Sequence, residues 1–308
     1  MGNTASNQFK LSRNTNKCSI NCGRNSNDSF KFINGRKFLK DSDKYILPSD
    51  EKELDRLHVQ HDLQIRIWNS HFSSPIEEIL KSGGAEVLDV GCGSGNWLLE
   101  MATNYPLSNF TGIDILPLYP MEIHPLNVIF ESVDVSTGLP FPDNHFDFIH
   151  LKCLLSTISE KYCNMKSLFN ELKRVLKPGG WIEIMEHDNE VINPSPTMKF
   201  FTGSYQALLR QRGINVYLCR EIPKCLDRHG LINIHSEEKI TYHGEKDGIV
   251  CELGIKNIIS IFSSLKSSIL EFMSINSEKF DNLLQDLFKE VNEYDSGFRT
   301  HRFYAQKP

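Results

Sequence analysis

The sequence lacks a long uninterrupted apolar run. Its most apolar stretch, residues 249–272, is broken by Glu252, Lys256 and Lys266 and repeats its apolar residues at helical spacing. A transmembrane helix needs about 20 consecutive, predominantly apolar residues. We therefore expect this stretch to form an amphipathic helix of a globular protein rather than a membrane span.

The eight cysteines include no C-x-x-C pair of the kind that binds a metal ion. They are scattered along the chain, and the first residues lack the apolar core of a secretion signal. Free thiols are typical of a reducing compartment. The sequence therefore predicts a cytoplasmic protein, with the nucleus left open as an alternative, and it predicts no bound metal ion.

Basic residues are scarce outside the N-terminal segment. The chain has 34 Lys and Arg against 39 Asp and Glu, yet residues 1–40 hold eight basic residues and one acid, Asp28. Nonspecific nucleic-acid binding needs a concentrated positive field, and the rest of the chain is acidic. We therefore expect no direct nucleic-acid binding. Residues 1–40 are the part of the chain that could attract a partner through positive charge.

Branched apolar residues are few in residues 1–35, which are rich in Asn, Ser and positive charge. Such a segment cannot bury enough apolar surface to offset the entropy of ordering, so we predict a disordered basic leader. Its first residues, MGNTAS, match the pattern for myristoylation of Gly2. One acyl chain binds a membrane only marginally, and a second signal would come from the basic residues or from acylation of Cys18 and Cys22. These features lead to the hypothesis of peripheral membrane association through residues 1–40.

Short apolar runs alternate with helical patterns from Glu86 onward, after an N-terminal helix that begins at an N-cap Ser49. Runs of this length, separated by helices, are typical of a parallel sheet covered on both faces. We predict an α/β domain over residues 36–308 with its core at about 75–190, and helical additions that form the acceptor side. The runs are EVLDV, NFTGID, NVIFESV, FDFIHL and WIEIME, with later strands around 231–242 and at FRTHRFYAQ.

The turn after the first run lacks the third glycine of a dinucleotide-binding loop. In EVLDVGCGSGNW, Asn96 stands where the G-x-G-x-x-G pattern has glycine, and the chain instead reads Gly91-x-Gly93-x-Gly95. Free N–H groups at a helix start, beside residues without a Cβ, let a ligand approach the backbone. Asp89, two residues upstream, would repel a pyrophosphate and attract an ammonium group.

S-adenosylmethionine fits this turn better than a dinucleotide, because it carries an ammonium group and no phosphate. A nucleotide-dependent oxidoreductase is therefore the disfavoured alternative. VLDVGCGSG also resembles the first motif of class I S-adenosylmethionine-dependent methyltransferases, and LKRVLKPGGWIEIME resembles the helix, turn and fifth strand of that family. IDILPLYPMEIHPLNVIFESVDV is similar to the fungal LaeA-like group, regulators of secondary metabolism and development. The resemblance implies a Rossmann-like, doubly wound, mostly parallel seven-stranded sheet with added helices, and S-adenosylmethionine as cofactor.

The resemblance also assigns cofactor-binding residues. Asp114, followed by Ile115, ends the second strand, where the acid of the family binds the ribose hydroxyls through charge-assisted hydrogen bonds. Asp134 corresponds to the acid that accepts the adenine amino group, and Val135 to the neighbouring backbone contact. Leu151 ends the fourth strand, under the methionine part of the cofactor.

Methyl transfer imposes no fixed catalytic residue. The sulfonium activates the methyl carbon for in-line displacement, and a general base is needed only when the acceptor arrives protonated. The candidate bases are His61, on the N-terminal helix, and Glu186 and His187, after the fifth strand. Cys92, inside the glycine turn, is expected to be a small spacer with a backbone role. The acceptor stays open as a small molecule, a protein side chain or a methionine of the enzyme itself. A regulatory or scaffold protein that binds the cofactor with little turnover also stays open.

Overall fold

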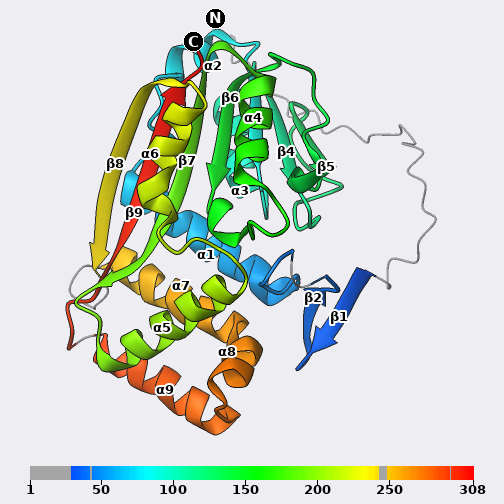
Figure 1. Cartoon of the computed structure of the whole chain (residues 1–308). Coiled ribbons are helices and arrows are strands. Elements are labelled where there is room, and N and C mark those ends of the chain that lie inside the picture. The colour runs from blue at the N-terminus through cyan, green and yellow to red at the C-terminus, as the bar shows by residue number, and fades with distance from the viewer. Residues whose placement is uncertain (1–28, 42–43, 243–247, 292) are drawn as a thin grey trace, which may run out of the picture.

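A seven-stranded sheet forms the centre of the molecule (Figure 1). Its strand order is β5-β4-β3-β6-β7-β9-β8, in which the first five strands run parallel and β9 runs antiparallel to both of its neighbours. This topology confirms the predicted doubly wound, mostly parallel sheet. The computed structural model describes residues 29–41, 44–242, 248–291 and 293–308. The strands of the sheet are β3 (Glu86–Val90), β4 (Asn109–Asp114), β5 (Val128–Ser132), β6 (Phe146–Lys152), β7 (Leu176–Ile192), β8 (Ile232–Tyr242) and β9 (Gly297–Gln306).

Helices cover both faces of the sheet and its carboxyl-terminal edge (Figure 1). One face packs against α4 and α6, and the opposite face packs against α2 and α3. Helices α5, α7, α8 and α9 form a second apolar core with one another, and together with α1 they lie beyond the carboxyl ends of the parallel strands. The helices are α1 (Glu51–Trp68), α2 (Glu77–Ser82), α3 (Asn96–Asn104), α4 (Met165–Val175), α5 (Pro196–Gln211), α6 (Leu218–Arg228), α7 (Ile249–Ser264), α8 (Lys266–Met273) and α9 (Ser277–Glu290).

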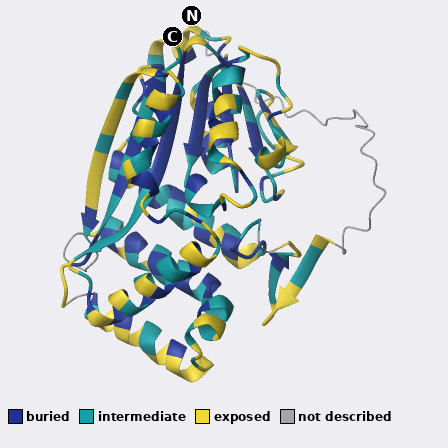
Figure 2. Ribbon diagram, in the orientation of Figure 1, coloured by how far each residue is buried: buried dark blue, intermediate teal, exposed yellow. Residues whose placement is uncertain are grey.

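Burial follows these layers (Figure 2). The inner strands are buried because helices lie on both of their faces, whereas the edge strand β8 is largely exposed. The sequence of helix α4 explains its position. Asn164 caps the start of the helix, and Leu168, Leu172 and Val175, at spacings of four and three, form a buried stripe that packs on the sheet. Among the described residues, no helix is both long enough and apolar enough to cross a membrane.

The N-terminal helix begins one residue later than predicted. Its N-cap is Asp50, whose carboxylate accepts the N–H of Glu53, and not Ser49. Ser49 instead donates its backbone N–H to the carbonyl of Lys37, and Arg36 holds the Asp50 carboxylate through two hydrogen bonds of 2.6 and 2.9 Å. The cap is therefore selected by a contact with the preceding hairpin.

The predicted boundary at residue 35 is wrong, because a hairpin spans it. Strand β1 (Phe30–Ile33) pairs antiparallel with β2 (Arg36–Leu39) across a turn in which Asn34 and Gly35 have positive φ angles, as Asn-Gly hairpin turns require. Asn34 also donates a 3.1 Å hydrogen bond to Ser267 at the start of α8. The domain thus begins before residue 35. The rest of the predicted leader, with Gly2, Cys18 and Cys22, lies outside the described residues.

Candidate cofactor and acceptor site

Two adjoining cavities lie at the carboxyl-terminal edge of the sheet. The larger has a volume of about 210 Å³ and lies between the glycine turn, the loop after β6, and helices α1, α5 and α7. The smaller, of about 70 Å³, lies at the ends of β4 and β5. This edge is where doubly wound sheets bind ligands. The two cavities share Tyr45, Gly91, Asp114, Leu154 and Thr157.

The glycine turn forms the sheet-side wall of the larger cavity. Gly91, Gly93 and Gly95 have φ angles of 72°, 55° and 76°, a region that residues with a Cβ rarely adopt. A Cβ on Gly93 would meet nothing closer than Leu57, at 3.5 Å. Backbone conformation rather than crowding therefore requires glycine there. Cys92 lies in the same wall, and burial raises the pKa of its thiol well above the usual range, which fits the predicted spacer.

Asp114 lies where the two cavities meet. Its Oδ2 accepts the N–H of Gly93 at 2.8 Å, and its Oδ1 accepts the N–H of Leu116 at 2.9 Å. Burial raises the pKa of this carboxyl group to about 6, although the backbone hydrogen bonds oppose the change. The carboxylate is thus fixed between the glycine turn and the end of β4, as its predicted role requires.

The acid predicted for the adenine amino group lines the smaller cavity together with Ile115 and Val135. Asp134 is already bonded on both oxygens: Oδ1 accepts from the N–H and hydroxyl of Ser136, and Oδ2 accepts from Lys44 Nζ at 2.8 Å. Burial opposes ionisation here, but the hydrogen bonds from Lys44 and Ser136 outweigh it and lower the pKa of Asp134. Lys44 therefore closes this end of the cavity.

Three predicted cofactor residues, Asp89, Gly95 and Leu151, do not line either cavity. A Cβ on Gly95 would meet the ring of Phe130 at 2.7 Å, so close packing as well as its φ angle requires glycine there. Asp89 is 3 % exposed, and its Oδ1 lies 2.8 Å from Nδ1 of His150, which stacks on Trp97. The predicted direct contact between Asp89 and the ligand is therefore wrong. Leu151 is fully buried in the core, and the next residue, Lys152, lines the cavity instead. Side chains alternate along a strand, so Asp89 points into the layer on the α3 face of the sheet and Leu151 into the opposite layer, on the α4 face.

Two of the three candidate bases also lie away from the cavity walls. His61 is buried behind Lys152, with its Nδ1 3.0 Å from Lys152 Nζ. Glu186 accepts the N–H of Leu155 at 2.7 Å and holds the loop after β6, and burial raises its pKa to about 7 against the opposing hydrogen bond from Ser156. Glu186 therefore positions a cavity wall and does not face a ligand.

His187 is the predicted base that does line the larger cavity. Its Nε2 lies 2.8 Å from Nε2 of Gln64 on α1. Burial, and then the positive charge of Arg56, lowers the pKa of His187 to about 4. The imidazole is therefore neutral at neutral pH.

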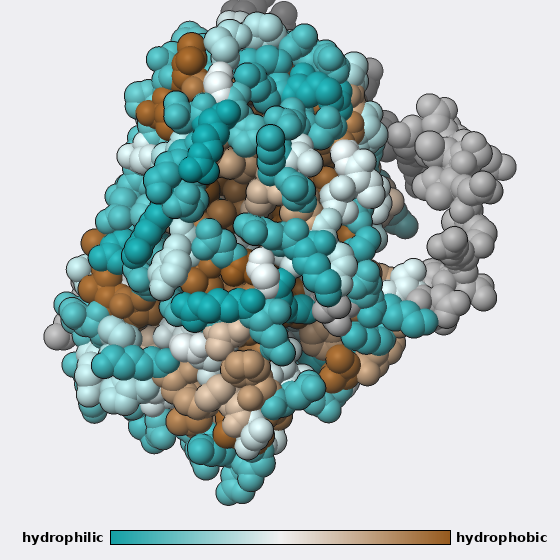
Figure 3. Space-filling view, in the orientation of Figure 1, coloured by the Kyte–Doolittle hydropathy of each residue, from teal (hydrophilic) through white to brown (hydrophobic). Residues whose placement is uncertain are grey.

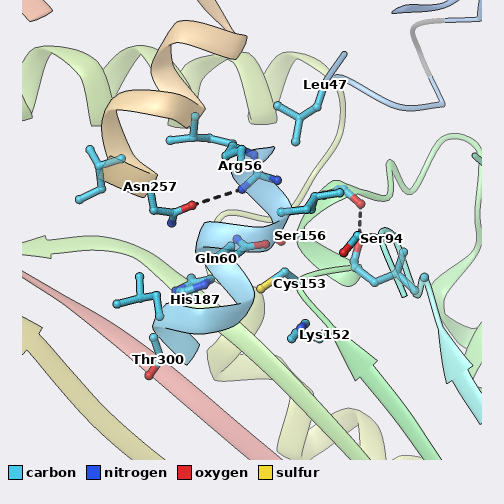
Figure 4. Close-up of a pocket in the computed structure, with 18 of the residues that line it drawn as sticks. Leu47, Arg56, Gln60, Ser94, Lys152, Cys153, Ser156, His187, Asn257 and Thr300 are labelled. Carbon is cyan, nitrogen blue, oxygen red and sulfur yellow. Dashed lines mark hydrogen bonds between the residues drawn. The ribbon is translucent and has the colours of Figure 1, made fainter. Parts of the chain in front are cut away.

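The opposite wall of the larger cavity comes from residues that the sequence analysis missed (Figure 4). Arg56 and Gln60 face the cavity from α1, and Asn257 faces it from α7, with a 3.4 Å hydrogen bond from Arg56 to Asn257 Oδ1. The spacing of Arg56, Gln60, Leu63 and Ile67 on one helical face was the available signal. In the part of the chain that the structure describes, no three His, Cys, Asp or Glu side chains gather as a metal site.

The face of the molecule seen in Figure 3 is mainly hydrophilic, with apolar residues showing across its middle, between the sheet and the lower helices.

Residues 60–236 match the family described as a methyltransferase domain. The chain belongs to this family. The match confirms the predicted class, an S-adenosylmethionine-dependent methyltransferase, and its cofactor.

Curated relatives of this methyltransferase include fungal proteins. The secondary metabolism regulator laeA of Coprinopsis cinerea is 33 % identical over 147 residues, which cover 47 % of this chain and 36 % of the relative. The protein-methionine methyltransferase laeA of Emericella nidulans is 32 % identical over 149 residues, covering 47 % and 37 %. The chain thus matches little more than a third of the length of these relatives. Phosphoethanolamine N-methyltransferase 2 of Haemonchus contortus, solved with S-adenosyl-L-methionine, is 18 % identical with a TM-score of 0.47, covering 82 % of this chain and 57 % of the other.

Proposed function

We propose that this methyltransferase moves a methyl group from S-adenosylmethionine to an acceptor held in the larger cavity. The observation that carries the proposal is the junction of the two cavities at Gly91 and Asp114. A cofactor with its adenine in the smaller cavity and its ribose at Asp114 extends over β3 toward β6. The wall built by α1, α5 and α7 would then hold the acceptor next to the methyl group.

The carboxylate of Asp114 binds the ribose in this arrangement. Its two oxygens each accept one backbone N–H, and their remaining lone pairs suit a vicinal diol. At the adenine end, the backbone of Val135 and the side chain of Ile115 line the ring site. Asp134 would hold the adenine amino group at Oδ2, the oxygen that accepts from Lys44 Nζ, so Lys44 would have to give up this bond.

The chain itself forms no covalent bond during the transfer. The acceptor attacks the methyl carbon in line with the departing sulfur, and the protein supplies orientation and exclusion of water. Asp89, paired with His150 behind the glycine turn, adds negative charge near the cofactor without touching it. His187 stays a candidate base because it faces the cavity in neutral form.

A regulatory role with little turnover is the second candidate. The Coprinopsis cinerea relative is named a secondary metabolism regulator, which favours this role, and the glycine turn would bind the cofactor in either role. Incubating a cell extract with the protein and methyl-labelled S-adenosylmethionine separates the two. Label in an acceptor, abolished by Asp114→Ala, supports transfer, whereas cofactor binding without labelled product supports the regulatory role.

Cofactor identity is tested by calorimetric titration. S-adenosylmethionine and S-adenosylhomocysteine should bind with one site per chain, and NAD should not bind. NAD binding together with no detectable binding of S-adenosylmethionine would contradict the proposed cofactor site.

We further propose a cytoplasmic protein that associates with membranes through residues 1–40. The supporting features are the MGNTAS start and the eight basic residues of this segment. The acidic remainder is proposed not to bind nucleic acid. Intact-mass analysis and membrane fractionation of protein from a eukaryotic host test the anchor, with Gly2→Ala as control. An unmodified, wholly soluble protein that behaves like its control would refute it.

A further inference from the structure

Lys152 occupies the centre of the carboxyl-terminal edge of the sheet. It is the last residue of β6, and because Leu151 pairs with Val90, Lys152 lies beside Gly91. Its side chain lines the larger cavity (Figure 4). The described residues offer its Nζ one hydrogen-bond partner, His61 Nδ1 at 3.0 Å, and no carboxylate at ion-pair distance. A half-buried ammonium group without a carboxylate partner loses part of its hydration, which destabilises it relative to the neutral amine.

A path for protons leads from Lys152 to the surface. His61 stays neutral because burial, and then the charge of Lys152, lowers its pKa to about 2. With Nδ1 facing Lys152, the ring carries its hydrogen on Nε2, 3.1 Å from Oε2 of Glu100. The N–H is not aligned with this oxygen, but the Glu100 side chain is 47 % exposed and free to turn. His71 lies 3.5 Å from the same oxygen. Lys152 is thus linked to solvent on the side away from the cavity.

Burial is the largest influence on Lys152 and lowers its pKa, while the nearest acids oppose the change. The titratable groups that interact with Lys152 come from several neighbouring segments. They are His61 on α1, His71 after α1, Asp89 on β3, Glu100 on α3, Cys153 after β6, His187 on β7 and Arg302 on β9. A positive charge entering the cavity shifts Lys152 further toward the amine.

The proposed cofactor supplies that charge. With adenine at Asp134 beyond β5 and ribose at Asp114 on β4, the rest of the cofactor extends over β3 to β6, where Lys152 stands. The sulfonium of S-adenosylmethionine is positive, and the sulfur of S-adenosylhomocysteine is neutral. Bound S-adenosylmethionine would therefore favour loss of a proton from Lys152, and the neutral sulfur left after transfer would restore the basicity of Lys152.

We propose that Lys152 is the general base of the transfer and that the acceptor is an O–H or N–H group rather than a thioether. This rests on the proposed function, binding of S-adenosylmethionine in this cavity. The acceptor lone pair forms a bond to the methyl carbon, and the S–C bond breaks with its electron pair going to sulfur. The proton of the acceptor passes to the Lys152 amine, and from there through His61 to Glu100 and solvent. A thioether acceptor has no such proton to lose.

The test measures protons released on cofactor binding. The full chain is titrated with S-adenosylmethionine, and separately with S-adenosylhomocysteine, in buffers of different ionisation enthalpy between pH 7 and 10. The two ligands carry the same titratable groups, but the sulfonium lowers the pKa of the α-ammonium group of S-adenosylmethionine. Each free ligand is therefore titrated separately and its own ionisation is subtracted, so the remaining difference isolates the effect of the sulfonium on the protein. We expect S-adenosylmethionine to release up to about one proton more per site, with a maximum between the Lys152 pKa values of the two complexes.

Variants assign that proton. Lys152→Met should abolish the difference in proton release between the two ligands. Lys152→Arg should also abolish it, although this variant keeps the positive charge. Lys81→Met, at an exposed position of α2, is the control and should leave the difference intact. The wild-type difference needs no variant, so a misfolded Lys152→Met does not stop the test. Equal proton release for both ligands would overturn the role of Lys152 while leaving the cofactor site in place. Binding of neither ligand would instead overturn the proposed function.

The acceptor class has its own readout. Products labelled from methyl-labelled cofactor in a cell extract should be methyl ethers, esters or amines. A labelled sulfonium product, as methylation of a methionine side chain gives, would overturn the inference that the acceptor loses a proton.

Discussion

At the scale of single residues, Asp114 connects the glycine turn to the end of β4 and faces both cavities. Replacing it with Ala removes the bonds from a charged acceptor to the ribose. We expect cofactor affinity to fall by about 1.5 to 3 kcal/mol, the scale of hydrogen bonds to charged groups, measured by titration calorimetry. Asp286→Ala, at an exposed position of α9, is the control and should bind normally. Normal binding by a folded Asp114→Ala protein would remove the ribose assignment.

The same carboxyl group predicts how binding depends on pH. Because burial raises the pKa of Asp114 to about 6, the group is protonated below that pH and ionised above it. Cofactor affinity should be constant well above pH 6 and should fall by up to about tenfold per pH unit below it. Asp114→Ala should show no such decline, and a wild-type affinity that is flat from pH 7 to 5 would contradict the assignment.

At the scale of elements, a buried ion pair within α1 forms the hydrogen bonds that join this helix to α7. Arg56 and Glu53 are 4 % and 0 % exposed and lie 2.7 Å apart, and Ser264 donates to Glu53 at 3.2 Å. Glu53→Ala leaves the guanidinium buried without its partner, so we expect a loss of about 3 to 5 kcal/mol in unfolding free energy. Asp62→Ala, which breaks an exposed pair on the same helix, should cost about 1 kcal/mol or less. Similar denaturation midpoints for the two variants would show that the pair does not stabilise the wall.

The glycine turn gives a second prediction at this scale. Gly93→Ala forces a Cβ into a left-handed conformation, which costs about 1 to 2 kcal/mol, and places a methyl group where the cofactor approaches. Gly84→Ala is the matched control, because Gly84 has a φ of 75° and nothing within 4 Å of its Cβ position. Both variants should lose similar stability in denaturation, but only Gly93→Ala should lose cofactor affinity. Equal affinities would mean that the turn is not the binding surface.

At the scale of the whole molecule, the hairpin and the preceding residues should behave differently. Deleting residues 2–28 should change neither the melting temperature nor cofactor affinity, because this segment has little apolar content to pack. Deleting residues 2–40 also removes Arg36 from Asp50 and the buried Phe38, so it should lower the melting temperature clearly. Thermal denaturation of both truncated proteins tests this. Equal melting temperatures would show that the hairpin adds no stability.

The sequence by itself determined the features that depend on neighbours along the chain. Strand periodicity, the Gly91-Gly93-Gly95 turn and the positions of Asp114 and Asp134 at strand ends are local patterns, and the structure has all of them. Burial on both faces of parallel strands is visible in composition alone. The fold class and the cofactor side of the site could therefore be predicted.

Only the tertiary structure decided which side chains face the cavity. Asp89 and Leu151 belong to the predicted strand ends, but helices on both faces of the sheet gave them buried surroundings, and periodicity cannot tell a cavity from a core. Arg56 and Asn257 lie 201 positions apart and meet only because α1 and α7 pack together. The surroundings of Lys152 likewise come from five separate elements. Such contacts follow from packing free energy summed over the whole core, which no local window of sequence contains.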